Sequence, residues 1–141
     1  MDKQKLESLI RKVLLEELGA ATHGVKKVSL PSETVTEADR LDTGRPGNVV
    51  YTKDLLTLEE SPRLGVGLMV MDRTTFPWTL NYDEVDYVIE GRLEILIGGD
   101  KVSAGPGEVI FIPKGSSIQF SVPDKARFLY VTYPADWQSQ G

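Results

Sequence analysis

The sequence has no cysteine and only one histidine, His23, in 141 residues. Without cysteine the chain cannot form disulfide bonds, a thiolate zinc site or a cysteine nucleophile, and this composition fits a reducing compartment such as the cytoplasm. A single histidine excludes metal sites built from two or three imidazoles, and it excludes serine–histidine–aspartate chemistry away from residue 23. We interpret His23 as an ordinary linker residue.

Long apolar runs and an excess of positive charge are also missing. The apolar runs span only a few residues, so nothing predicts a membrane span, and the N-terminus lacks the apolar segment of a signal peptide. Sixteen basic residues stand against 21 acidic ones, a net charge of −5. This balance argues against nucleic acid or an anionic membrane as the main partner.

The charge is distributed unevenly, which predicts an N-terminal appendage followed by a domain. The first 27 residues carry six basic and four acidic side chains, whereas the rest of the chain carries ten basic and seventeen acidic ones. Small residues without a hydrophobic pattern follow at 20–24 and are typical of a linker. We therefore expect a helix and linker over residues 1–24 and one domain over residues 25–141.

Residues 2–18 predict an amphipathic helix that Asp2 caps and Gly19 ends. One apolar stripe recurs at the helical period. The stripe consists of Leu6, Leu9, Ile10, Val13 and Leu14. The helix either folds back over the domain core or docks into a groove of another protein, as amphipathic anchors do. A membrane-surface helix would carry more basic and aromatic residues.

From residue 25 onward the hydrophobic period changes from 3.6 to 2, which predicts many short strands separated by Gly/Pro turns. The expected strands are 25–30, 49–51, 64–71, 84–90, 93–97, 109–112, 117–122 and 127–133. A turn is expected at 122–124, and the polar segment 35–46 predicts a loop or a brief helical turn. The glycines at 65 and 67 indicate close packing or a bulge. The pattern favours an antiparallel sandwich or barrel.

Two motifs make this fold class more specific. Six residues separate Glu84 from Gly91, and Gly107–Gly115 has the form Gly-x5-Pro-x-Gly, fifteen residues further on. These segments resemble the first and second motifs of the cupin superfamily. The resemblance implies an all-β cupin jelly-roll barrel, the RmlC-like double-stranded β-helix, preceded by the N-terminal helix.

The chain departs from the cupin pattern at the metal ligands. In register, Trp78, Leu80 and Ile118 stand where cupins place histidines, and only Glu84 remains of the four ligands. One carboxylate does not make a tight site for iron, manganese, nickel or zinc. We therefore expect no tightly bound cofactor and no transition-metal site.

The orientation of the first-motif strand stays open at this point. The alternation alone would bury Val85, Tyr87 and Ile89 and expose the acids, whereas the cupin register turns Glu84 and Asp86 into the barrel. Both faces of the strand can be buried if a homodimer covers the outer one. In the cupin register Glu84, Asp86 and Tyr82 are the candidate catalytic groups. The candidate substrate-binding residues are Trp78, Leu80, Ile118, Phe120 and Lys114. Glu84 and Asp86 could also hold Mg²⁺ weakly, together with ATP or ADP.

The segments PWTLNYDEVDYVIEG and GEVIFIPKGSSIQFS resemble the EutQ family of ethanolamine utilisation proteins. That resemblance implies a place in a bacterial microcompartment and acetate kinase activity, which converts acetyl phosphate and ADP to acetate and ATP. The N-terminal helix is similar to encapsulation peptides, so a shell or cargo protein is the expected partner. No phosphate-binding Gly-x4-Gly-Lys-Ser/Thr loop accompanies these motifs. A non-enzymatic assembly or binding protein that uses the barrel as a scaffold is the alternative, and a metal-independent isomerase or sugar-binding cupin is a third.

Overall fold

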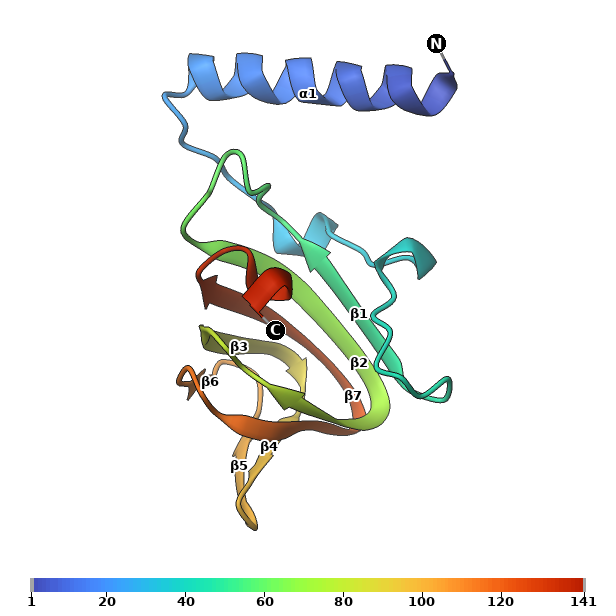
Figure 1. Cartoon of the computed structure of the whole chain (residues 1–141), viewed down its shortest axis with the longest axis vertical. Coiled ribbons are helices and arrows are strands. Elements are labelled where there is room, and N and C mark those ends of the chain that lie inside the picture. Colours follow the sequence, from blue (N-terminus) through green and yellow to red (C-terminus); the bar gives the residue numbers. More distant parts are fainter. Residues whose placement is uncertain (1, 141) are drawn as a thin grey trace. The chain divides into compact units, whose positions relative to one another are not determined.

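The computed structural model describes residues 2–140, and it describes the side chains of all of these except residues 15–21. The chain divides into two compact units between Glu33 and Thr34 (Figure 1). The boundary that we expected after residue 24 stays a prediction. No helix within residues 2–140 is long and apolar enough to cross a membrane.

The first unit contains helix α1 (Lys3–Ala21) and the short 3₁₀ turn η1 (Leu30–Ser32). Asp2 caps the helix as predicted, because its Oδ1 accepts a hydrogen bond of 2.9 Å from the Lys5 N–H. The predicted stop at Gly19 is wrong, since the helix continues to Ala21. The chain leaves the helical conformation at His23 and Gly24, where φ reaches 57° and 85°. The five residues of the apolar stripe are 43% to 53% exposed.

The second unit is an antiparallel β-structure of seven strands. The strands are β1 (Val49–Asp54), β2 (Gly65–Thr79), β3 (Asp83–Gly91), β4 (Leu93–Ile97), β5 (Asp100–Ala104), β6 (Val109–Ile112) and β7 (Ser117–Tyr133). Neighbouring strands follow the order β1–β2–β7–β3–β6, and β4 pairs with both β5 and β7. The turn η3 (Trp137–Gln140) follows the last strand.

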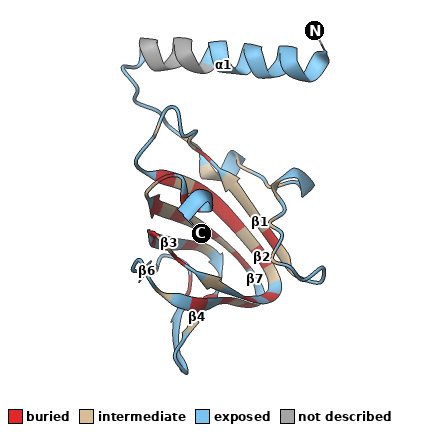
Figure 2. Cartoon of the chain, viewed as in Figure 1, coloured by how far each residue is buried: buried red, intermediate tan, exposed pale blue. Residues whose placement is uncertain are grey.

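Strand β7 connects strands β1 and β2 with strands β3 to β6 (Figure 1). One edge of β7 pairs with β2 along both strands, from the Gly65–Thr132 pair to the Thr79–Ser117 pair. The other edge pairs with β3 near the end of β7 and with β4 near its beginning. The long strand therefore passes from one face of the fold to the other, and its buried residues contribute to the common core (Figure 2).

Several of the predicted strand and turn positions are wrong. Residues 25–29 are irregular and Leu30–Ser32 form η1, which contains Pro31 at its start. The expected turn at 122–124 lies inside β7, opposite a register shift between Asp72 and Thr74 of β2. β2 extends to Thr79 rather than 71. β5 was not predicted because only its last residue, Ala104, is buried, so it has no apolar alternation.

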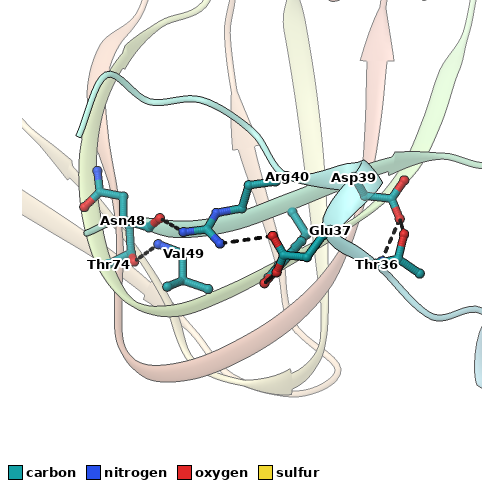
Figure 3. A network of polar contacts seen from close by, with 8 residues as sticks. Thr36, Glu37, Asp39, Arg40, Asn48, Val49 and Thr74 are labelled. Carbon is teal, nitrogen blue, oxygen red and sulfur yellow. Dashed lines mark hydrogen bonds and ion pairs between the residues drawn. The ribbon is translucent and has the colours of Figure 1, made fainter. Parts of the chain in front are cut away.

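The outer edge of the sheet is fixed by the brief helical turn that we expected within 35–46, which is η2 (Glu37–Asp39). The Arg40 guanidinium donates to the Asn48 carbonyl at 2.6 Å and lies 3.6 Å from the Glu37 carboxylate (Figure 3). The Tyr51 hydroxyl of β1 donates to the same carboxylate at 2.8 Å. These contacts hold the segment that leads to Leu41 against the edge of the sheet.

Candidate functional site

The interior of the barrel contains one small cavity of about 20 Å³ among the described residues, which is room for about one water molecule. Aromatic side chains from β2, the loop between β2 and β3, β7 and the C-terminal turn form most of its wall. They are Phe76, Trp78, Tyr82, Phe120, Tyr130 and Trp137, and Leu41, Thr52, Met69 and Glu84 complete the lining. Glu84 is the only charged residue of this lining within the described chain.

Two glycines of β2 make room for the polar side chains beside the cavity. A Cβ atom at Gly67 would collide with the Tyr130 ring, and one at Gly65 would collide with the Thr132 hydroxyl. The expected close packing at these glycines is therefore confirmed. With Gly67 beneath it, Tyr130 reaches across the strand and donates a 2.9 Å hydrogen bond to Asp54 Oδ1.

Strand β3 turns its two acids into the barrel, as the cupin register predicted and the simple alternation did not. Glu84 is 5% exposed and Asp86 is 0% exposed, whereas Val85 and Tyr87 on the other face are 37% and 42% exposed. The register shifts between Val88 and Glu90, which leaves Glu90 exposed rather than on the buried face.

Several oxygens of the two buried acids lack a hydrogen-bond partner in the geometry of the described structure. Within the described residues, Glu84 Oε2, both carboxyl oxygens of Asp86 and Thr132 Oγ1 have no hydrogen-bond partner. Thr132 lies opposite Glu84 in the β3–β7 pairing. Buried polar atoms without partners are costly, and they are often the places where a ligand binds.

Burial also changes how these acids titrate. Loss of solvation raises the pKa of Glu84 from 4.5 to about 7, and the neighbouring Asp86 carboxyl offsets part of the rise. Burial, reinforced by Glu84, raises the pKa of Asp86 well above its usual value. Burial likewise raises the pKa of the Tyr82 hydroxyl, with the charge of Glu84 adding to the effect.

Trp137 lines the cavity from the C-terminal turn. Its ring centroid lies 6.1 Å from that of Trp78 and 6.0 Å from those of Tyr82 and Tyr130. The Trp78 Nε1–H donates to the Tyr82 hydroxyl at 2.7 Å, which fixes two of these rings relative to each other. Trp137 was not predicted as a site residue, because it follows the last strand and lies outside both cupin motifs. The chain has only two tryptophans, and this rarity was the one signal in the sequence that pointed to Trp137.

The structure brings together some of the predicted site residues and separates others. Trp78, Tyr82, Glu84 and Phe120 line the cavity. Leu80, Ile118 and Asp86 are buried in the barrel but outside this lining. The Lys114 side chain is exposed and lies outside the lining, and its backbone N–H donates to Asp83 Oδ1 at 2.7 Å. The sequence reasoning also missed Tyr130, Met69, Phe76, Leu41 and Thr52.

No three His, Cys, Asp or Glu side chains of the described residues are grouped so that they could hold a metal ion together. Glu84 and Asp86 are therefore a pair of buried acids without a third such ligand in the described part of the chain.

Solved structures show which class of protein this fold defines. The chain matches the cupin domain of a transcriptional regulator from Enterobacter cloacae with a TM-score of 0.52 and 16% identity, covering 60% of this chain and 95% of that one. At this identity the likeness shows the fold alone. Together with the antiparallel topology, it confirms the predicted all-β cupin jelly roll.

Closer relatives define the family. A family model described as ethanolamine utilisation protein EutQ matches residues 1–139. A Clostridioides difficile (strain 630) protein named acetate kinase EutQ is 59% identical over 151 residues, covering 99% of this chain and 96% of that protein. The solved structure of the Clostridium difficile EutQ protein matches with a TM-score of 0.83 and 70% identity, covering 84% of this chain and 87% of that chain. The chain belongs to the EutQ family of ethanolamine utilisation proteins, which confirms the resemblance in the sequence.

The raised pKa of the acids predicts that the second unit loses stability as the pH rises. Folding raises the pKa of Glu84 from 4.5 to about 7. Its contribution to the free energy of unfolding is therefore complete below pH 4.5 and is lost as the pH rises through about 7. The free energy of unfolding should therefore fall between pH 5 and pH 8, by on the order of 3 kcal/mol from Glu84. Urea unfolding at both pH values measures this difference.

The variants Glu84→Gln and Asp86→Asn should each reduce this pH dependence, and the double variant should remove most of it. Glu90→Gln, on the same strand but exposed, is the matched control and should behave like the unmodified protein. An equally steep pH dependence in the double variant would show that other groups cause it.

Proposed function

We propose that the protein is an acetate kinase of ethanolamine utilisation, which converts acetyl phosphate and ADP to acetate and ATP. The observation that carries this proposal is the 59% identity, over nearly the whole chain, to a protein named acetate kinase EutQ. In the reaction, a terminal phosphate oxygen of ADP forms a bond to the phosphorus of acetyl phosphate. The bond from phosphorus to the acetyl oxygen breaks, and acetate leaves with the electron pair.

The cavity sets physical conditions on this reaction. Both substrates are polyanions, whereas the lining offers one carboxyl group and no basic side chain within the described residues. A cavity that holds about one water also admits neither substrate. Binding of either substrate at Glu84 therefore requires the side chains around the cavity to move.

The Mg²⁺ that phosphoryl transfer uses does not fit this cavity. Mg²⁺ demands octahedral oxygen coordination and usually keeps several of its waters. The cavity has about 20 Å³, largely aromatic walls and only one carboxyl group in its lining. The expected weak Mg²⁺ site at Glu84 and Asp86 is therefore not part of this proposal, and the metal would arrive on the phosphates of the nucleotide.

Turnover tests the proposal directly. The purified full chain should form ATP from acetyl phosphate and ADP in a luciferase-coupled assay. Glu84→Gln should lower kcat/KM by about 100-fold, the usual effect of losing a positioned acid or base. Asp86 and Tyr82, the other candidate catalytic residues, are tested as Asp86→Asn and Tyr82→Phe, and Glu90→Gln should retain full activity. Turnover that survives in Glu84→Gln would place the reaction elsewhere.

A scaffold without enzymatic activity is the second candidate, and the nearly filled barrel favours it. Core side chains occupy the interior of the fold and leave room for about one water. A pure preparation without any ATP formation would support this candidate over the kinase.

We also propose that α1 docks the protein to a shell or cargo protein of a bacterial microcompartment. The five stripe residues are about half exposed, and an isolated helix of this length is marginal in water, so the stripe needs a surface to bury against. The boundary between the two compact units separates this helix from the barrel.

Deleting residues 1–20 should leave the thermal midpoint of unfolding nearly unchanged and should abolish co-localisation with a fluorescent shell protein. Leu9→Glu with Val13→Glu in the full chain should reproduce that loss, because it charges the apolar stripe. Gln4→Glu with Ser8→Glu adds the same charge on the opposite face and should preserve localisation. A deletion that unfolds the barrel would instead assign the helix to covering the core.

The outer face of β3 and β6 supports the homodimer that we expected. Val85 pairs with Phe111 and Tyr87 with Val109, so their exposed side chains form one continuous apolar surface. Phe111 and Val109 are 61% and 59% exposed. An exposed patch of this kind usually marks an interface, and a second copy of the same patch complements it by two-fold symmetry.

Sedimentation velocity at micromolar concentration should therefore give a dimer. Phe111→Asp should shift the protein to monomer, because it places a charge within the patch. Val102→Asp, at an exposed position of β5 outside the patch, should remain dimeric. A monomeric unmodified protein would contradict this interface.

A further inference from the structure

We propose that the cavity at Glu84 binds the head of a small primary ammonium cation, R–NH₃⁺, which the Glu84 carboxylate holds inside a box of aromatic rings. This site goes beyond the phosphoryl transfer proposed above and does not depend on it. The box consists of Trp78, Tyr82, Tyr130 and Trp137.

The rings of the box surround the cavity on several sides. Trp137 lies about equally far from the other three, with ring-centroid distances of 6.0 to 6.1 Å. All four rings line the same small space. The faces of such rings attract ammonium groups, and boxes of this kind recognise organic cations.

The carboxyl side of the cavity supplies the counter-charge and the acceptors. Glu84 lines the cavity, is 5% exposed, and its Oε2 has no partner among the described residues. The oxygens of Asp86 and Thr132 nearby are also unpartnered. A primary ammonium has three N–H donors and one positive charge, so it supplies the donor and the charge that the Glu84 carboxylate lacks.

The dimensions of the cavity select the class of cation. An ammonium head is about the size of a water molecule, and the cavity of about 20 Å³ accommodates one. The partly exposed lining residues Leu41, Thr52 and Trp78 mark the open side, toward which a short substituent would extend. A quaternary ammonium is too large for this space and has no N–H to donate.

Fluorescence and calorimetric titrations of the full chain test this site. Both tryptophans of the protein line the cavity, so its occupation should change their emission. The probes are the chlorides of ammonium, methylammonium, ethanolamine, tetramethylammonium, potassium and magnesium, in amine-free buffer at constant ionic strength. We expect saturable binding of the primary ammonium probes and none of tetramethylammonium. No acetyl phosphate or ADP is present, so the result is independent of kinase activity.

Variants assign the binding to the cavity. Glu84→Gln should weaken the binding of ethanolamine by about tenfold or more, because the counter-charge is lost. Glu84→Asp, which keeps the charge, should retain part of the affinity, and the exposed control Glu90→Gln should retain all of it. Circular dichroism confirms that each variant is folded. The proposal is overturned by the absence of saturable binding, by an equal response to potassium or magnesium, or by undiminished affinity in Glu84→Gln.

Discussion

The pairing of β2 with β7 is the constraint on which the rest of the structure depends. It places Gly67 opposite Tyr130 and Gly65 opposite Thr132. The two glycines have no side chain, so they leave room for the Tyr130 ring and the Thr132 hydroxyl. Because β7 then continues into pairing with β3, the same register sets Tyr130 opposite Asp86 and Thr132 opposite Glu84. The cavity, its acids and its aromatic wall all follow from this single alignment of strands.

Much of this arrangement could be predicted from the sequence, because the cupin motifs fix which face of β3 is buried. The periodicity alone would have turned Glu84 outward, since Val85 and Tyr87 make the outer face more apolar than a solvent-exposed face usually is. The missed features are of another kind. β5 has no buried alternation, and Trp137 reaches the cavity only through tertiary packing of a segment that carries no motif. The helix end was misplaced because Gly19 permits a stop without requiring one.

The chemistry of the cavity and the activity of the named relatives impose opposite demands. Acetyl phosphate and ADP require positive charge, whereas the cavity provides the unpartnered Glu84 Oε2 and aromatic side chains, and both attract cations. Burial reduces this conflict within the protein itself, because it raises the pKa of Glu84 to about 7 and the pKa of Asp86 well above its usual value. A cation that enters the cavity favours the ionised form of Glu84, whereas an anion must avoid the cavity or bring its own counter-charge.

The surfaces that we assign to binding, self-association and docking lie on different elements of the chain. The cavity faces the inside of β3, the apolar patch occupies its outside together with β6, and the exposed stripe belongs to α1 in the separate first unit. Alternation along β3 keeps the first two apart, because adjacent residues point to opposite faces. Glu84 and Val85 are neighbours in sequence but act on opposite sides of the sheet, so a substitution at one leaves the surface formed by the other intact. The three roles can therefore change independently within one short chain.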